Sequence, residues 1–178
     1  ICNGEPVTVY FTSGNTGGTT TYSWSNDNTS IGLPDSGQGD NISFTTTNTG
    51  YGPTVANVTV TPHFEYAGVT CDGPPETFAI SVFPSGQVND PTDLVVCNFD
   101  FTPTITFTSN NTGGTTTFDW TNDNPLIGLA PSGSGPIGQF LAMNGGTEPI
   151  VATITVTPTF NYPSFGDDIG VHCPGTPE

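Results

Sequence analysis

The chain carries one stretch of sequence twice, and this repeat constrains the possible folds more than any other feature. The segment that begins at Asn15 returns at Asn111, a shift of 111 − 15 = 96 positions. The same shift relates Ile31–Leu33 to Ile127–Leu129. A period of this size is too long for a solenoid repeat and suits one small all-β domain. The sequence therefore predicts two tandem domains, residues 1–84 and residues 85–178.

Composition and alternation indicate that both domains are built from β-strands. Of the 178 residues, 23 are glycine and 17 are proline, which favour turns, while the many threonines favour strands. Apolar residues recur at every second position, which is typical of strands with one buried face. Short strands separated by Gly, Pro, Asn and Asp predict all-β sandwich domains.

The alternation also predicts which side chains face inward. Trp24 and Trp120 occupy equivalent positions, and burying one large aromatic ring stabilises a domain by roughly 2–3 kcal/mol. We therefore expect both tryptophans in the cores. The other expected inward positions are Val7, Val9, Phe11, Tyr22, Phe44, Ala56, Val58, Val60, Phe78, Ile80 and Val82, and, in the second copy, Ile105, Phe107, Phe118, Phe140, Ala152, Ile154 and Val156.

The two copies differ at their ends. The junction falls near residues 84–87, and residues 88–96 open the second copy without an equivalent before Cys2. Residues 77–82 have no counterpart after Glu178. We therefore expect a window cut out of register from a longer array, in which the second domain lacks its last strand.

The charge balance excludes several function classes. The chain has 16 acids, no Lys or Arg, and a formal net charge of −16. Binding of nucleic acid through phosphate neutralisation is therefore not expected, and neither is attraction to an anionic membrane by a basic patch. No stretch is long and apolar enough to predict membrane insertion.

The four cysteines occupy equivalent places in the two copies, with Cys2 matching Cys97 and Cys71 matching Cys173. Repeat symmetry favours the disulfides Cys2–Cys71 and Cys97–Cys173. Each would close a loop of about 70 residues and contribute roughly 4 kcal/mol in the chain-entropy model. Disulfides would also imply an oxidising compartment. Metal ligation and free thiols are the alternatives, although no CxxC or Cys/His cluster is present.

Acidic residues in the turns offer a second candidate site. Asp27 and Asp123 lie between asparagines directly after each tryptophan-bearing strand. Their oxygens are suited to Ca²⁺, which would make the chain a calcium-stiffened linker. The other interpretation, which we favour, is an Asx turn that satisfies backbone amides. We expect Asp167 and Asp168 to lie in a solvated loop rather than a metal site.

No group of residues predicts catalysis. His63 and His172 are single histidines at positions that the repeat does not match, and neither belongs to a recognisable Ser/His/Asp or Cys/His arrangement. No repeated pair of carboxylates suggests acid–base chemistry. We therefore do not expect an enzyme, and no cofactor is implied beyond the Ca²⁺ alternative.

The repeat resembles the PKD-like, immunoglobulin-fold repeats of very large surface proteins of Bacteroidetes. The resemblance covers nearly the whole chain. It lies in the segments Val96–Asn98, Thr21–Trp24, Asn26–Asn28, Ile31–Leu33, Ser36–Gly37, Ala56–Pro62, Cys71–Phe78 and Ile80–Val82. The chain departs from the simple repeat at Pro136–Gln139 and in a longer loop before Cys173.

The resemblance implies two tandem immunoglobulin-like sandwiches that serve as stalk repeats of a large cell-surface adhesin in surface adhesion and gliding motility. It further implies an extracellular location at the cell surface and export by the type IX secretion route. The implied partners are neighbouring repeats of the same chain, an external surface or polysaccharide, and the outer-membrane gliding or secretion machinery. The family has no catalytic residues.

An alternative function is a carbohydrate-binding or spacer module of a secreted multidomain hydrolase. In that case exposed aromatic side chains would stack on sugar rings. The candidates for such stacking are Tyr10, Tyr51, Tyr66, Phe160 and Tyr162.

Overall fold

The structure is a computed structural model that describes residues 1–163 and 170–178. The chain divides into two compact units, unit 1 from Ile1 to Pro84 and unit 2 from Ser85 to Glu178. The described residues form β-strands and two short 3₁₀ turns, with no α-helix. The all-β fold class is therefore confirmed, and the open sheets are consistent with β-sandwiches.

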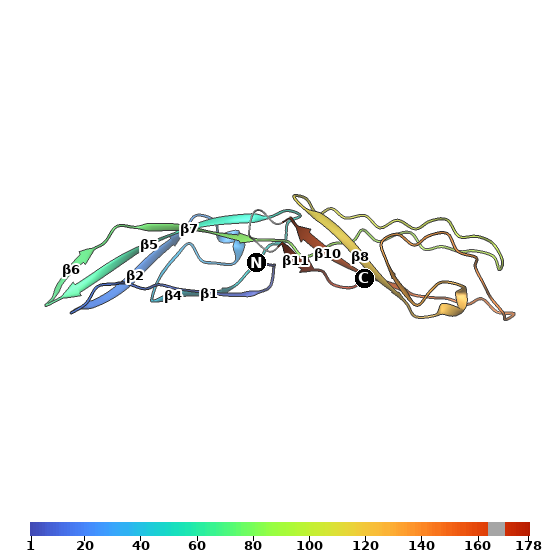
Figure 1. The fold of residues 1–178 in the computed structure, drawn as a ribbon, viewed down its shortest axis with the longest axis horizontal. Helices are drawn as coiled ribbons and strands as arrows, with labels where there is room; N and C mark the ends of the chain where they lie inside the picture. Colours follow the sequence, from blue (N-terminus) through green and yellow to red (C-terminus); the bar gives the residue numbers. More distant parts are fainter. Residues whose placement is uncertain (164–169) are drawn as a thin grey trace. The chain divides into compact units, whose positions relative to one another are not determined.

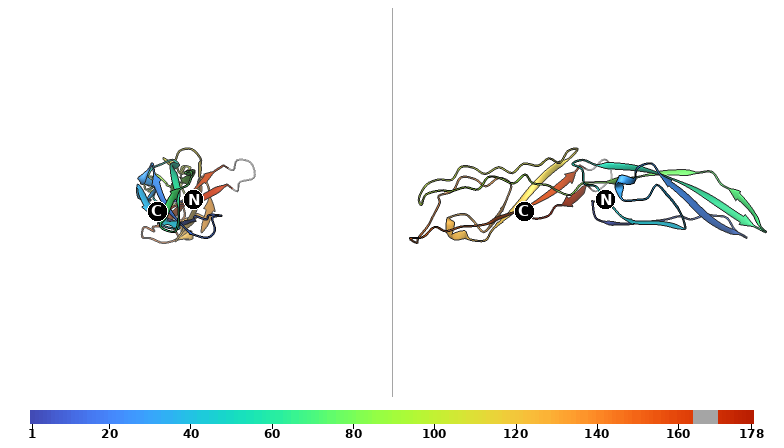
Figure 2. Two further views of the ribbon diagram at one scale, coloured as in Figure 1. Left: turned by 90° about the vertical axis from the view of Figure 1, so that its left-hand side faces the viewer. Right: turned by 180° about the vertical axis from the view of Figure 1, so that it is seen from behind.

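Unit 1 contains two sheets that lie as facing layers (Figure 1, Figure 2). The larger sheet has the order β3-β2-β5-β6, with β7 also paired to β5, and the smaller sheet pairs β1 with β4. The elements are β1 (Pro6–Tyr10), β2 (Thr19–Asn26), η1 (Thr29–Ile31), β3 (Ser36–Gln38), β4 (Asn41–Thr45), β5 (Thr54–Tyr66), β6 (Val69–Asp72) and β7 (Glu76–Val82).

Unit 2 repeats the larger sheet in part. Its strand order is β11-β10-β8-β9, in which β8 and β10 correspond to β2 and β5. The elements are β8 (Thr115–Asn122), η2 (Pro125–Ile127), β9 (Ser132–Ser134), β10 (Ile154–Tyr162) and β11 (Val171–Pro174). The segments opposite this sheet are extended and joined by single bridges, such as Ile105 with Ile137.

The cores lie where the alternation predicts. In unit 1, Tyr22, Ile42, Ala56, Val58, Val60, Ile80 and Val82 are buried together with Ile31 and Leu33. In unit 2, Trp120, Val156, Leu129, Ile137 and Val88 are buried. Trp120 is thus a core residue as predicted, whereas Trp24 is only partly buried and packs against the margin of its core.

Two of the strands predicted in the second copy are irregular. Ile105 and Phe107 pack against the core as expected but lie in a segment with isolated bridges, and Phe140 precedes a single bridge rather than forming a strand. The reason is local: Pro103 and Pro136 have no N–H, so neither can donate to an uninterrupted ladder. The matching residues of unit 1 form the regular β1–β4 pair.

Each tryptophan lies over a glycine on the neighbouring edge strand. Trp24 pairs with Gly37 and Trp120 with Gly133. A Cβ added at either glycine would come within 2.3 Å of the indole ring. The repeated Ser-Gly dipeptide therefore provides the space that the ring occupies.

We expect Gly37→Ala to destabilise the chain by about 1–3 kcal/mol, because the ring or the strand must move to admit the methyl group. Urea unfolding followed by circular dichroism measures this. Gly14→Ala is the matched control, because a Cβ there meets nothing within 4 Å. Equal midpoints for the two variants would contradict the packing argument.

Candidate functional site

A buried asparagine holds the turn that follows each tryptophan strand. In unit 1 the amide nitrogen of Asn26 donates to the carbonyls of Leu33 at 2.9 Å, Asn28 at 3.1 Å and Pro34 at 3.2 Å. Its oxygen accepts from the Asn28 N–H at 3.0 Å. This one neutral side chain therefore fixes both ends of the η1 turn.

Unit 2 repeats the arrangement with small changes. Asn122 donates to the carbonyls of Leu129 at 3.1 Å and Ala130 at 3.2 Å, and it accepts from the Asn124 N–H at 3.0 Å. Asn26 and Asn122 are both buried. The repeated asparagine is thus a structural residue in both copies.

The adjacent aspartates link the turn to the long strand. In unit 1, Asp27 accepts from the Asn57 backbone N–H at 2.7 Å and from the Asn57 side-chain amide at 2.8 Å. The side-chain amide and then the backbone N–H of Asn57 hold the Asp27 pKa below its ordinary value of 3.8. In unit 2, Asp123 accepts from the Thr153 N–H at 2.7 Å.

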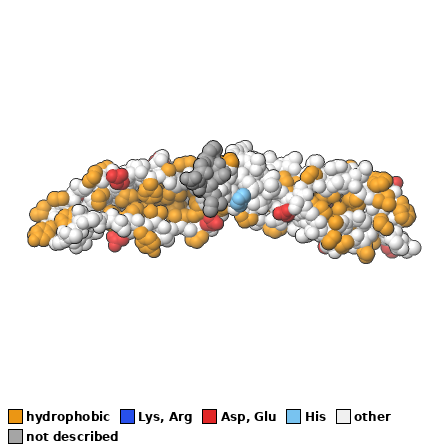
Figure 3. Space-filling view, viewed as in Figure 1, with side chains coloured by type: hydrophobic (Ala, Val, Ile, Leu, Met, Phe, Trp, Pro, Cys, Tyr) orange, Lys and Arg blue, Asp and Glu red, His pale blue; other side chains and the backbone are white. Residues whose placement is uncertain are grey.

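These contacts favour the turn interpretation over Ca²⁺ binding. Both carboxylate oxygens of Asp27 already face amide donors. Within residues 1–163 and 170–178, no three His, Cys, Asp or Glu side chains come together as a metal site would require. Figure 3 likewise shows acidic side chains scattered singly over the visible face. Asp167 and Asp168 lie outside the described residues.

The cysteine pairing predicted from repeat symmetry is wrong. Cys2 and Cys173 are disulfide-bonded, whereas Cys71 and Cys97 are free and exposed. Neither Cys2–Cys71 nor Cys97–Cys173 therefore forms.

Strand geometry explains the error in unit 1. At the start of β5, Thr54 pairs with Val82. The next residue, Phe83, forms a bridge with Cys2. Cys71 pairs with Phe64, ten residues further along β5. Ten residues of strand span about 33 Å, whereas a disulfide requires Cα atoms within about 7 Å of each other. The two sulfurs belong to opposite ends of the sheet.

The same separation applies in unit 2. Asn98, which follows Cys97, exchanges hydrogen bonds with Asn144 near the η2 turn. Cys173 pairs with Phe160, towards the opposite end of β10. The equivalence of the cysteines in the two copies does not indicate how far apart the two cysteines of one unit lie along the sheet.

Sequence reasoning missed a line of three polar side chains on the larger sheet of unit 1. Ser23 Oγ lies 2.7 Å from His63 Nε2, and His63 Nδ1 lies 2.5 Å from Asp72 Oδ1. The residues come from β2, β5 and β6, so their sequence spacing gave no signal. They have the identities and order of a hydrolase triad.

The surroundings do not suit acyl transfer. Ser23 lies within β2, which is flanked by β3 and β5, so the backbone donors of this strand serve the sheet rather than an oxyanion. Asp72 is 69% exposed, and unit 2 has Asp119 and Thr159 at the positions of Ser23 and His63. We interpret the line as a cross-strand hydrogen-bond chain.

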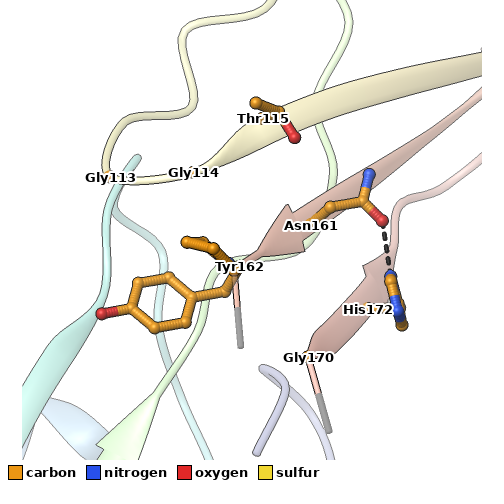
Figure 4. Close-up of a pocket in the computed structure, with 8 residues that line it drawn as sticks. Gly113, Gly114, Thr115, Asn161, Tyr162, Gly170 and His172 are labelled. Carbon is orange, nitrogen blue, oxygen red and sulfur yellow. Dashed lines mark hydrogen bonds between the residues drawn. The ribbon is translucent and has the colours of Figure 1, made fainter. Parts of the chain in front are cut away.

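A groove in unit 2 contains the second histidine (Figure 4). His172 Nδ1 lies 2.6 Å from the side-chain oxygen of Asn161, and the Tyr162 ring projects to the other side of β10. The lining residues are Gly113, Gly114, Thr115, Asn161, Tyr162, Pro163, Gly170 and His172. The groove presents amide, imidazole and aromatic groups.

The aromatic residues proposed to stack on sugars are dispersed. Phe160 is 0% exposed, so its prediction as a sugar-stacking residue is wrong, because its ring lies under Gly114 within the sheet. Tyr10, Tyr51 and Tyr66 are exposed. Tyr51 precedes β5 and Tyr66 ends it, so about 15 residues of chain, up to about 50 Å if extended, separate the two rings.

Three comparisons with known proteins found nothing similar to this chain: no family model, no curated protein and no solved structure matches it. Among the described residues, no helix has the length and apolar character needed to cross a membrane.

We expect Asn26→Asp to destabilise the chain at pH 7 by more than about 3 kcal/mol, because a carboxylate would face three carbonyl oxygens without a donor. Lowering the pH should restore part of the loss, since a protonated carboxyl can donate once. Asn15→Asp makes the same charge change at an exposed position and is the control. A loss no larger than the control's would show that the hydrogen bonds of the Asn26 amide are dispensable.

The lowered pKa of Asp27 predicts a pH dependence. A carboxyl whose pKa is lower in the folded state adds stability above its unfolded value of 3.8, and that stability is lost as the pH falls through the folded pKa. Asp27→Asn should therefore flatten the acid limb of stability against pH below about 4. Asp93→Asn, an exposed change of equal charge, should leave the limb unchanged, and identical curves for both variants would refute the assignment.

Thiol labelling tests the cysteine assignment. Maleimide added to the native chain without reductant should modify two thiols, Cys71 and Cys97, because both are exposed. Mass spectrometry of the intact protein counts the adducts, and Cys71→Ser should leave one. A native chain with no adducts would contradict the assignment, because Cys71 and Cys97 would then not be free thiols.

Proposed function

We propose that the two units are stalk repeats of a large extracellular surface adhesin, which carry tension in surface adhesion and gliding motility. The observation that carries this proposal is the pairing of the first and last segments of unit 1. Cys2 bridges Phe83 in a parallel arrangement. Tension applied to the two ends of the unit would therefore act on neighbouring chain segments.

Three backbone hydrogen bonds reinforce this parallel pair. The Ile1 backbone nitrogen donates to the Ser81 carbonyl at 3.3 Å, the Phe83 N–H donates to Ile1 at 2.8 Å, and the Asn3 N–H donates to Phe83 at 2.9 Å. We name this contact of residues 1–3 with residues 81–83 the terminal clamp. Force on parallel neighbours pulls them past each other in shear, so the bonds must break together rather than one by one.

The residues that recur in both units have structural roles, and this supports the same proposal. The hydrogen bonds of the buried asparagine, the aspartate contact and the Trp–Gly pair occur in both units and all stabilise the unit that contains them. The reactive-looking line Ser23–His63–Asp72 occurs in one unit alone. A part repeated for length requires structural residues in every copy, whereas an enzyme requires a reactive group.

Composition and resemblance extend the proposal to location and partners. A disulfide favours an oxidising, extracellular setting, and a strong negative charge keeps crowded copies apart in solution. The sequence resemblance is to PKD-like repeats of gliding-motility adhesins such as SprB. The proposed partners are neighbouring repeats, an external surface or polysaccharide, and the outer-membrane gliding or secretion machinery.

Single-molecule pulling of the chain from its two ends, in reductant, tests the tension-bearing role. Asn3→Pro removes the N–H that bonds Phe83 and should lower the peak unfolding force of unit 1. Asn3→Ala keeps that N–H and removes the side-chain acceptor for Asn48, so its force should stay nearer to the wild-type value. Equal forces for the two variants, or no resolved force peak in the wild type, would refute the proposal.

The groove of unit 2 favours one other candidate, a carbohydrate-binding module. Tyr162, Asn161 and His172 offer the aromatic face and polar groups that sugar sites use. A glycan array with the intact chain tests this. Binding that Tyr162→Ala abolishes, while Tyr10→Ala preserves it, would support a glycan site, and an empty array would remove it.

A further inference from the structure

The chain contains two Asn-Gly dipeptides, Asn3–Gly4 in unit 1 and Asn144–Gly145 in unit 2. In such a dipeptide the backbone nitrogen of glycine can attack the side-chain carbonyl carbon of asparagine, because glycine has no Cβ to obstruct the approach. Asparagine is among the thermolabile residues of proteins. The two dipeptides differ in how the structure holds the attacking nitrogen.

The nitrogen of Gly4 is held away from this reaction. Its N–H donates to the Thr46 carbonyl at 2.9 Å, and the Asn3 side-chain oxygen accepts from the Asn48 N–H at 2.8 Å. The glycine nitrogen must lose its proton before it attacks, so these hydrogen bonds must first open, as they do in amide hydrogen exchange. Asn3 is therefore protected as long as unit 1 is folded.

The nitrogen of Gly145 has no such restraint. Within residues 1–163 and 170–178 its N–H has no hydrogen-bond partner. Gly145 is exposed, and a Cβ built on it would meet nothing within 4 Å. The loop is equally open in unit 1, where the matching Thr49 is exposed although β7 is paired with β5. Water and hydroxide therefore reach the Gly145 amide in the folded chain.

The side chain of Asn144 is already turned towards this backbone. Its oxygen accepts from the Gly146 N–H at 2.8 Å, and its nitrogen donates to the Glu148 carbonyl at 2.9 Å. The Gly146 N–H polarises the side-chain carbonyl and would stabilise the negative charge that develops on its oxygen when a nitrogen adds to the carbon. The turn therefore places an accessible nucleophile next to a polarised electrophile.

Unit 1 has the same turn without the labile dipeptide. The Asn48 side-chain oxygen accepts from the Gly50 N–H at 3.0 Å, as that of Asn144 does from Gly146. The residue between Asn48 and Gly50 is Thr49, whose stiff, branched Cβ obstructs attack by its own nitrogen. The difference between threonine and glycine at this one position therefore separates a stable turn from a labile one.

We propose that Asn144 is a site of intramolecular deamidation. The Gly145 nitrogen gives up its proton and forms a bond to Asn144 Cγ, the bond from Cγ to the side-chain nitrogen breaks, and that nitrogen leaves with the proton as ammonia. Water then opens the resulting succinimide at either carbonyl, which gives aspartate or isoaspartate. The sum is the uptake of water and the release of ammonia, with no change of oxidation state.

The products loosen unit 2 at this turn. A carboxylate has no N–H to donate to the Glu148 carbonyl. In isoaspartate the main chain runs through the side-chain carbon, so the residue 144 carbonyl, which accepts from the Asn98 amide at 3.0 Å, becomes a carboxylate outside the main chain. Unit 2 therefore loses hydrogen bonds with time, whereas the matching turn of unit 1 keeps them.

Incubation of the full chain in mildly alkaline buffer tests the site. Peptic digestion in acid halts the reaction during work-up, and tandem mass spectrometry locates each side-chain amide that has become a carboxyl group. An isoaspartate-specific methyltransferase with a radiolabelled methyl donor measures the isomer independently. In the folded chain Asn144 should convert at least about tenfold faster than Asn3, because only the Gly4 nitrogen must wait for local opening.

Urea provides the control for the dipeptide itself. In the unfolded chain Asn3 and Asn144 should convert at similar rates, because both precede glycine. Gly145→Thr copies the turn of unit 1 and should nearly abolish conversion at Asn144. Equal rates for Asn3 and Asn144 in the folded chain, or an Asn144 that reacts only in urea, would overturn the proposal.

The denaturant midpoint tests the structural consequence. The midpoint of the wild-type chain should fall as its isoaspartate content rises, while that of Gly145→Thr, incubated alongside, should stay constant. A constant midpoint in a fully converted wild-type chain would overturn the claim that the products loosen unit 2.

Discussion

Each unit depends on one antiparallel pair, the tryptophan strand with the long strand that follows it. In unit 1, β2 and β5 pair over the whole of β2, and β3, β6 and β7 each attach to one of these two strands. In unit 2, β8 and β10 hold β9 and β11 in the same way. The pair positions the tryptophan over its glycine, the asparagine under its turn and the aspartate against the opposite strand. If this pair of strands separated, the tryptophan, asparagine and aspartate contacts would all be lost.

Much of this architecture could be predicted from the sequence, because strand burial follows a simple alternation. Val58 and Val60 are buried as their spacing predicts, and so is Trp120. The irregular segment around Phe140 could not be derived from alternation alone, since nearby prolines remove ladder donors. Trp24 shows a further limit, because it is only partly buried whereas Trp120, at the equivalent position of the other copy, is buried.

The candidate sites were less accessible to sequence reasoning. Symmetry between the copies suggested disulfides within each unit. Symmetry does not indicate how far apart two cysteines lie, and Cys2 and Cys71 lie near opposite ends of β5. The line from Ser23 to Asp72 crosses three strands and becomes visible only when their register is known. In both cases the missing information was the alignment of strands along the sheet.

The polar contacts that hold the units are almost all neutral, and this has a consequence for the medium in which the chain works. Asn26, Asn122 and Asn48 bind through uncharged amides, and the sole contact between a basic and an acidic side chain within the described residues is that of His63 with Asp72. Higher ionic strength therefore has few attractive charge pairs to weaken, while it screens the mutual repulsion of the 16 acids. Concentrated electrolytes such as brine should favour the folded chain, whereas very dilute water should be its least favourable solvent.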